Sequence, residues 1–113
     1  TMDKKVFGQI GENMAADVLR AKGYRIMRQN NRCKQGEVDI IAERHGHLSF
    51  VEVKTRQNFN FGRPCECITE DKKKHIRKAA YRYMEEIREN GYYPIDYDFQ
   101  VIEIVVEQTE YAF

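Results

Sequence analysis

The spacing of apolar residues divides the chain into six elements. Helical spacing recurs over 6–22, where Gly23 ends the pattern, and from an N-cap at Thr69 to Asn90, where Gly91 ends it. Shorter runs rich in β-branched and aromatic residues predict strands over 24–30, 37–44, 47–54 and 97–107. The order helix, strand, strand, strand, helix, strand indicates a mixed α/β fold, and we expect residues 1–113 to form a single domain.

The larger apolar residues mark the faces on which the two helices are expected to pack. The stripe of the first helix consists of Phe7, Ile10, Met14, Val18 and Leu19. The stripe of the second helix consists of Ile76, Ala80, Tyr83, Met84 and Ile87.

The clearest local signal is a β-hairpin centred on the dipeptide His45-Gly46. If this dipeptide forms the turn, opposed residues have numbers that sum to 91, so Asp39 faces Glu52 and Glu37 faces Lys54. Because side chains alternate along a strand, these four charged residues share one face. Opposed Cβ atoms lie about 4.5–5.5 Å apart, and like charges at that range repel by roughly 3 kcal/mol at an effective dielectric near 20.

An aspartate opposite a glutamate calls for a compensating positive charge. Lys54 is one source, and a divalent cation is the other. Asp39, Glu52 and the backbone carbonyl of Val53 offer the hard oxygen ligands that Mg²⁺ (or Mn²⁺) accepts, with water completing the shell. An ordinary solvent-facing hairpin with cross-strand ion pairs is the alternative; it accounts for Glu37 opposite Lys54 but not for Asp39 opposite Glu52.

Charge is distributed unevenly, although the net charge is only +1. Residues 20–35 hold six basic side chains and no acid, whereas residues 85–113 hold eight acids against Arg88. This polarity favours a basic face for nucleic-acid phosphates, and solvated surface charge is the alternative. No apolar run approaches the roughly 20 residues of a membrane helix. Three cysteines without a secretion signal favour reduced thiols and a cytoplasmic location.

Several motifs resemble known families. Asp39 followed by Glu52-Val53-Lys54 resembles the D…(D/E)-x-K signature of the restriction-endonuclease-like (PD-(D/E)XK) nuclease superfamily. A closer resemblance, to the YraN-like family of small bacterial proteins, runs from about residue 8 to residue 83. Its motifs are Gly11-Glu12, Gly36-Glu37-Val38-Asp39-Ile40-Ile41, Phe50-Val51-Glu52-Val53-Lys54-Thr55-Arg56 and Phe61-Gly62-Arg63-Pro64.

The same layout is similar to that of archaeal Holliday-junction resolvases, and this comparison puts Glu12, Asp39, Glu52 and Lys54 on catalytic positions. The resemblance implies a restriction-endonuclease-like mixed sheet with flanking helices. It also implies metal-dependent hydrolysis of phosphodiester bonds, in DNA rather than RNA, with branched or damaged DNA as candidate substrates. The residues expected to contact phosphates are Arg32, Arg56, Arg63, Lys72, Lys73 and Lys74.

Two other functions remain open. One is a non-catalytic nucleic-acid-binding module with a vestigial nuclease fold, and the other is a structural domain whose acidic C-terminal part binds a protein. The clustered acids argue against the binding module, since phosphate binding alone does not need them. A homodimer is a further expectation, because cutting two strands needs two sites. The apolar strand 97–107 is its candidate interface, and burial within one chain explains that strand almost as well.

Overall fold

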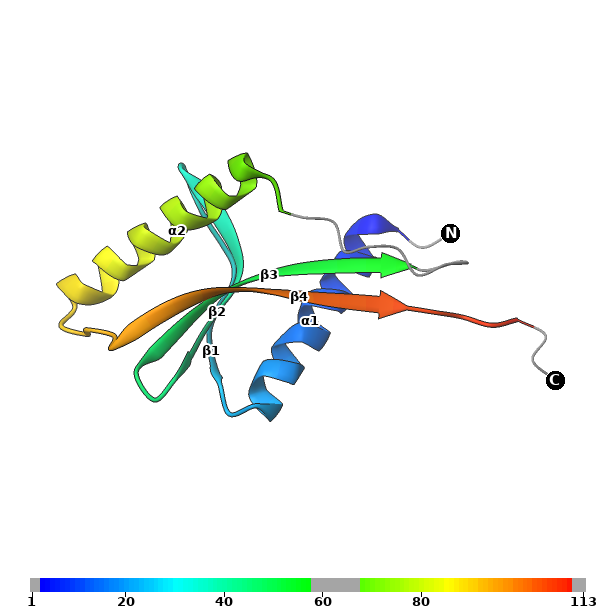
Figure 1. The fold of residues 1–113 in the computed structure, drawn as a ribbon, viewed down its shortest axis with the longest axis horizontal. Helices are drawn as coiled ribbons and strands as arrows, with labels where there is room; N and C mark the ends of the chain where they lie inside the picture. Colours follow the sequence, from blue (N-terminus) through cyan, green and yellow to red (C-terminus); the bar gives the residue numbers. More distant parts are fainter. Residues whose placement is uncertain (1–2, 58–67, 111–113) are drawn as a thin grey trace.

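The computed structural model describes residues 3–57 and 68–110. The described chain folds into two helices and a four-stranded sheet, which confirms the predicted class and element order (Figure 1). The elements are α1 (Lys4–Ala21), β1 (Arg25–Cys33), β2 (Gly36–Arg44), β3 (His47–Gln57), α2 (Glu70–Glu89) and β4 (Asp96–Val106). Asp3 and Thr69 cap the two helices by accepting hydrogen bonds from backbone N–H groups of the first turn.

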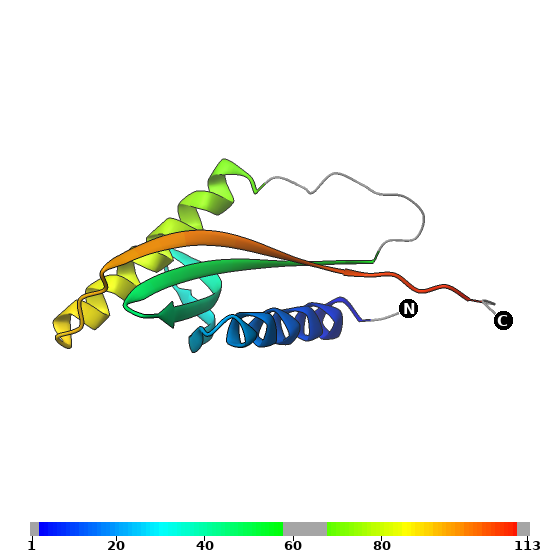
Figure 2. The ribbon, with the colours of Figure 1, turned by 60° about the horizontal axis from the view of Figure 1, so that its bottom comes forward.

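The sheet has the strand order β1-β2-β3-β4, with β4 parallel to β3 and the other neighbours antiparallel. The two helices lie on opposite sides of β3 and β4 (Figure 2). One core, which includes Phe50 and Ile41, packs against α2. The other, which includes Val51 and Ile40, packs against α1. Helices on both faces explain why this part of β2 and β3 is apolar on both sides.

The hairpin joining β2 and β3 has the predicted register. His45 and Gly46 both have positive φ, 52° and 82°, as a two-residue type I′ turn requires. The paired residues sum to 91 from Arg44 opposite His47 to Ile40 opposite Val51, where the recorded pairing of the two strands ends. β2 then continues beside β1, whereas β3 continues beside β4, so the sheet forks at the next two residues, Asp39 and Glu52 (Figure 1).

Two strands are longer than predicted. β1 runs on to Cys33 because Asn31, Arg32 and Cys33 pair with β2, which leaves a two-residue turn where a longer polar loop was expected. β3 runs on to Gln57, since β4 pairs with it along its whole length. The ends of these strands carry polar side chains, so the hydrophobicity pattern did not predict them. Hydrogen bonding between backbones does not depend on apolar side chains.

The predicted packing face of α1 is wrong for Ile10, Met14 and Val18, whereas Leu19 is buried and Phe7 is partly buried. Ile10, Met14 and Val18 are 41–46% exposed, and Val6, which precedes the predicted stripe, is 54% exposed. The buried residues are mostly small: Gly11, Glu12, Ala15, Ala16 and Leu19. The physical reason is close packing, because a Cβ built on Gly11 would lie 1.9 Å from Thr55 Oγ1 on β3. The predicted stripe of α2 is confirmed, with Ile87 partly buried.

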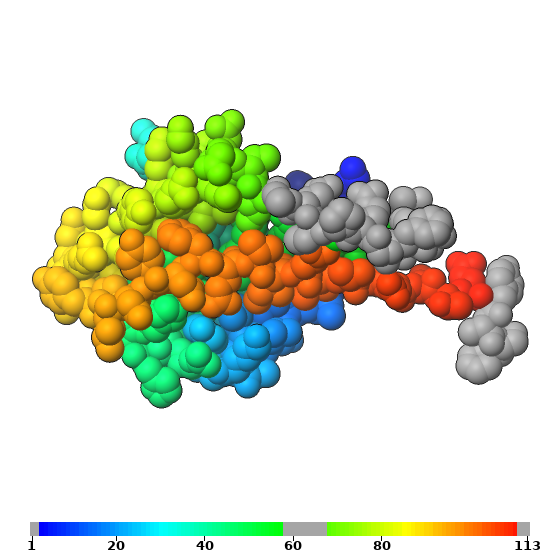
Figure 3. Space-filling model, in the orientation of Figure 1, coloured from blue at the N-terminus to red at the C-terminus, as the bar shows by residue number. Residues whose placement is uncertain are grey.

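β4 forms one edge of the sheet and lies across the front of the molecule between α2 and the elements below it (Figure 3). Ile102 and Ile104 pack against the core on the α1 side, whereas Val101 and Val105 are 46% and 47% exposed. The homodimer through this strand stays a prediction. Among the described residues, neither helix combines the length and apolar character needed to cross a membrane.

Candidate functional site at the fork of the sheet

An open cleft of about 1030 Å³ lies where β2 and β3 separate. The charged residues that line it come from both helices and three strands, and four are acidic and four basic. They are Lys4, Lys5, Glu12, Arg32, Glu37, Asp39, Glu52 and Lys72. The fork therefore gathers three of the four predicted catalytic residues into one cleft.

Glu52 and Asp39 form the centre of this cluster. Glu52 is only 8% exposed, and its Oε2 atom is buried without a hydrogen-bond partner in the described part of the protein. Burial, together with the hydrogen bond and negative charge of Asp39, raises the pKa of Glu52 to about 8. Asp39 Oδ2 accepts a hydrogen bond of 2.8 Å from the backbone N–H of Val53, which bridges the fork. An unpartnered buried carboxyl oxygen beside a second carboxylate is what a missing cation would leave.

Glu12 reaches the cluster from α1. The close contact of Gly11 with Thr55 holds the helix against β3, and the Glu12 side chain, 7% exposed, turns into the cleft. Burial and the charge of Asp39 raise its pKa, and a 3.4 Å hydrogen bond from Gln29 opposes that effect. The adjacent pair Gly11-Glu12 thus has a physical explanation: the glycine permits the approach that delivers the carboxylate.

The cation in contact with the central cluster is Lys72 of α2. Its Nζ lies 3.2 Å from Glu37 Oε1 and 3.7 Å from Glu52 Oε1. Arg32 holds the other oxygen of Glu37 at 3.3 Å. Although burial opposes it, the charge of Glu52 and the hydrogen bond to Glu37 raise the pKa of Lys72. Glu37 therefore has Lys72 and Arg32 as partners, where the sequence had suggested Lys54.

A second glycine fixes this arrangement. A Cβ built on Gly36 would lie 2.0 Å from the backbone oxygen of His75, so only glycine lets α2 come this close to the start of β2. His75 lies one turn after Lys72 on the same helix. Gly11 and Gly36, which both stand beside acidic residues in the sequence, thus each permit a close approach between a helix and the sheet.

Lys54, the lysine of the predicted motif, is half-buried on β3 but does not line the cleft. Its side chain makes no ion pair or hydrogen bond within the described chain. Val53 does line the cleft. Side chains alternate along β3, so Lys54 projects to the same face as Glu52, two residues farther along the strand. The structure therefore brings together Glu12, Asp39, Glu52 and Val53 in the cleft, and Lys54 follows Glu52 on the same face of β3 without lining the cleft.

The predicted phosphate contacts are dispersed. Arg32 and Lys72 line the cleft, but both are paired with Glu37. Arg56 is bound to Glu103 of β4, with Nε and Nη2 at 2.8 and 2.5 Å from one carboxylate oxygen. Lys73 pairs with Glu70 at 3.3 Å and Lys74 is exposed. Arg63 lies outside the described residues.

Two cationic residues of the cleft were missed in the sequence. Lys4 and Lys5 stand on the first turn of α1 at the rim. Their spacing could have revealed them. Lys4 and Lys5 precede Glu12 by eight and seven residues, which is about two helical turns, so they lie on the same side of the helix as Glu12. Across residues 3–57 and 68–110, no group of three or more His, Cys, Asp or Glu side chains is arranged to hold a metal ion. A cation at the fork would depend on two carboxylates, a backbone carbonyl and water.

Residues 11–104 match the uncharacterised protein family UPF0102. The chain belongs to this family. A UPF0102 protein of Chloroherpeton thalassium is 39% identical over 92% of this chain and 78% of its own length. UPF0102 proteins of Clostridium novyi and Caldicellulosiruptor bescii are 40% and 42% identical, over 92% and 94% of this chain and 84% and 87% of their own lengths.

Membership in UPF0102 confirms the family resemblance carried by the Gly11-Glu12 and Gly36-Glu37 motifs. The matched range contains Glu12, Asp39, Glu52 and Lys72, whereas Lys4 and Lys5 precede it. The family match therefore covers the acidic residues at the fork, and Lys4 and Lys5 at the rim of the cleft lie outside it.

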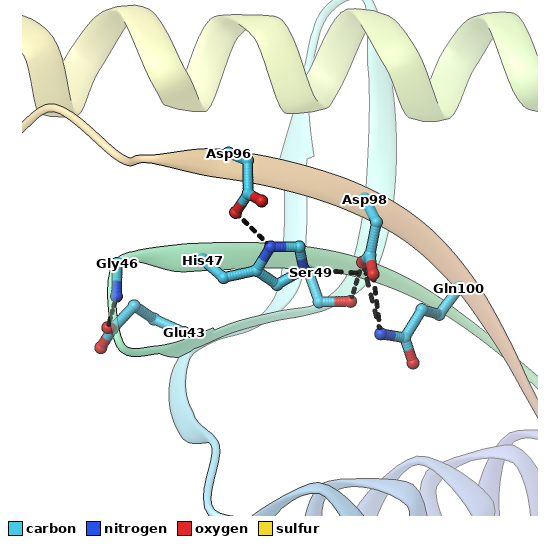
Figure 4. Close-up of polar contacts among 7 residues, drawn as sticks. All are labelled: Glu43, Gly46, His47, Ser49, Asp96, Asp98 and Gln100. Carbon is cyan, nitrogen blue, oxygen red and sulfur yellow. Dashed lines mark hydrogen bonds and ion pairs between the residues drawn. The ribbon is translucent and has the colours of Figure 1, made fainter.

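A second polar cluster of this UPF0102 protein lies at the other end of β3 (Figure 4). His47 stands between Asp96 and Asp98 of β4, with its Nε2 3.1 Å from Asp98 Oδ2. Ser49 donates a 2.6 Å hydrogen bond to the same aspartate. The hydrogen bond to Asp96 raises the pKa of His47, and partial burial opposes it. Because the serine hydroxyl is bonded to a carboxylate and not to the imidazole, the cluster joins the ends of two strands and is not a nucleophilic triad.

Proposed function

We propose that this protein hydrolyses phosphodiester bonds in DNA with a divalent cation, Mg²⁺ or Mn²⁺, held by Asp39, Glu52 and the carbonyl of Val53. The observation that carries the proposal is the buried Glu52 carboxyl, with one unpartnered oxygen, beside Asp39 in an open cleft. A protein selected only for stability gains nothing from two adjacent acids at a point where the sheet opens.

The third ligand follows from backbone geometry. The N–H and C=O of one residue point to the same side of an extended strand. Since the Val53 N–H points across the fork to Asp39, the Val53 carbonyl faces the fork as well. Two carboxylates and one carbonyl leave room for several waters, and Mg²⁺ retains waters readily. The residues present therefore fit such an ion.

The chemistry divides between the ion and the side chains. A bound divalent cation would polarise a phosphoryl oxygen and lower the pKa of a coordinated water. Glu12, close to Asp39 and desolvated, would hold that water and accept its proton. Lys54 would either orient the water or stabilise the negative charge that develops on the phosphate. Lys4 and Lys5, on the rim, would bind the phosphates that flank the cut.

The substrate class rests on resemblance. The layout of Glu12, Asp39, Glu52 and Lys54 is similar to that of archaeal Holliday-junction resolvases, which favours DNA, and branched or damaged DNA in particular. The open form of the cleft is compatible with a bulky substrate.

Cleavage of linear, nicked, flapped and four-way DNA, each with Mg²⁺, Mn²⁺ or EDTA, tests the proposal. We expect metal-dependent cleavage by the wild type, and a loss of at least about 100-fold in Asp39→Asn and Glu52→Gln, as for groups that act directly at the reacting centre. Glu89→Gln, an exposed acid on α2, is the matched control and should cleave normally. DNA binding in EDTA should survive in all four proteins.

Two results would contradict the proposal. Cleavage that persists in Asp39→Asn would move the active site elsewhere. DNA binding without cleavage on any of the four substrates, in either metal, would instead favour the non-catalytic binding module.

A further inference from the structure

The contacts of Lys72 set it apart from the other lysines in the basic segment that contains it. Its ammonium bridges two carboxylates that come from different strands, Glu37 of β2 and Glu52 of β3, at 3.2 and 3.7 Å. The Lys72 side chain is about one third exposed (34%), and the side chain of Glu52 that it faces is 9% exposed. A lysine whose sole role was to bind phosphate would be expected to be exposed to solvent, as Lys74 is.

This position is fixed by the backbone. The Gly36 contact with His75 holds the first half of α2 against β2, and Thr69 caps the helix three residues before Lys72. Lys72 also continues the buried stripe of α2, one turn before Ile76. The helix therefore delivers its ammonium to the fork in every folded molecule.

We propose that Lys72 is an internal counter-ion that neutralises the carboxylate cluster while no metal is bound, and that it withdraws when a divalent cation arrives. The inference rests on the function proposed above, since it concerns the same cluster. A dication coordinated by Glu52 would lie about 2 Å from the carboxylate oxygen, and an ammonium within 4 Å of that carboxylate would repel it strongly. Both cations cannot hold their best positions together.

The withdrawn Lys72 ammonium would move to the open side of the cleft. Lys72 lines the cleft, and its flexible stem and partial exposure let it swing from the carboxylates toward the open side. A substrate phosphate bound in the cleft would be its new partner. Lys72 is thus a positioning residue whose two states couple metal binding to DNA binding: metal frees the lysine, and the freed lysine binds phosphate.

Calorimetric titration with Mn²⁺ tests the exchange without relying on activity. Lys72→Met removes the charge and keeps the stem, so we expect it to bind Mn²⁺ about tenfold more tightly than the wild type. Lys72→Arg keeps the charge and should stay within about threefold of the wild type. Lys73→Met, the neighbouring lysine paired only with Glu70 among the described residues, is the matched control and should also be unchanged.

DNA binding provides a second readout. Replacing EDTA by Mn²⁺ should strengthen binding of an uncleaved duplex to the wild type, and the gain should be several-fold smaller in Lys72→Met, which has no ammonium to release. A merely structural Lys72 would alter stability but leave this metal-dependent gain unchanged. If Lys72→Met does not fold, Lys72→Gln takes its place in both measurements.

The outcomes separate the two proposals. Equal or weaker Mn²⁺ binding in Lys72→Met than in the wild type would overturn the exchange and leave the nuclease proposal standing. Mn²⁺ binding by Lys72→Met but not by the wild type would support the exchange in its strongest form. Failure of all four proteins to bind Mn²⁺ would overturn both, because no metal would then compete with the lysine.

Discussion

Glutamine in place of Glu52 removes an ionisable group whose charged form is disfavoured in the metal-free fold. In the wild type Glu52 is 8% exposed and lies against Asp39, and one of its carboxyl oxygens has no hydrogen-bond partner among the described residues. Glu52→Gln keeps the length and shape of the side chain. The variant therefore isolates the effect of the charge on the stability of the fold.

The size of the effect follows from linkage. The pKa of Glu52 is about 8 in the folded protein against 4.5 for the unperturbed group. Because the protonated form is favoured in the folded state, the stability of the wild type is highest below pH 4.5 and falls as the pH rises to 8. At about 1.4 kcal/mol per pH unit, the loss is about 3 kcal/mol at pH 7 and approaches 5 kcal/mol above pH 8. Glu52→Gln should not show this loss.

The buried amide has its own cost of about 1–3 kcal/mol, since its polar atoms replace the contact with Lys72. That cost does not change with pH. We therefore expect the stability difference between variant and wild type to move in favour of the variant by about 4 kcal/mol between pH 5 and pH 8. The test is therefore the change of this stability difference with pH, and not its value at any one pH.

Urea unfolding in EDTA at pH 5, 6, 7 and 8 measures this shift, with Glu89→Gln as a control that should run parallel to the wild type. Adding Mg²⁺ at pH 8 should then stabilise the wild type and leave Glu52→Gln unchanged, since one ligand is missing. Parallel stability profiles of wild type and Glu52→Gln from pH 5 to pH 8 would refute the reasoning, because they would mean that Glu52 carries no raised pKa.

Three further predictions concern other parts of the molecule. Gly36→Ala, whose Cβ would lie 2.0 Å from the His75 carbonyl oxygen, should destabilise the fold by about 2–3 kcal/mol in urea unfolding, and normal stability would show that α2 can shift. Lys4→Gln combined with Lys5→Gln should reduce the slope of log affinity for DNA against log salt by about two, and an unchanged slope would exclude the α1 rim from the interface. For His47, the hydrogen bond to Asp96 raises the pKa against an opposing effect of burial, so its contribution is complete below about pH 6.5 and disappears as the pH rises through the folded-state pKa. The stability gap between wild type and His47→Gln should therefore close with rising pH, and a constant gap would contradict this role.

The register of the β2–β3 hairpin could be predicted because two independent signals agreed. The turn dipeptide His45-Gly46 fixed the centre, and period-two alternation fixed the faces on either side. Local rules of this kind extend only as far as the pairing does. Beyond Ile40 and Val51 the strands part, and nothing within the hairpin itself signals where a sheet will fork.

The packing face of α1 could not be predicted from hydrophobicity. Large apolar side chains dominate any apolar stripe, but a helix held at the distance set by Gly11 and Thr55 buries mostly small residues. Ala15 and Ala16 are therefore buried at 0% and 1% exposure, while Met14 remains 46% exposed. The close approach of α1 to β3, which is a property of the tertiary structure, determines which face of the helix is buried.

Lys72 shows why a motif does not identify every charge at a site. Alternation along β3 puts Lys54 on the same face as Glu52, but Lys54 lies two residues farther along the strand and does not line the cleft. Lys72 is eighteen positions further along the chain than Lys54, yet a helix packed on Gly36 brings its ammonium to within 3.7 Å of Glu52. The signal was present in the helix, because Lys72 stands one turn before the buried Ile76. A polar residue that continues an apolar stripe has to face something polar across the sheet, and here that is the carboxylate cluster at the fork.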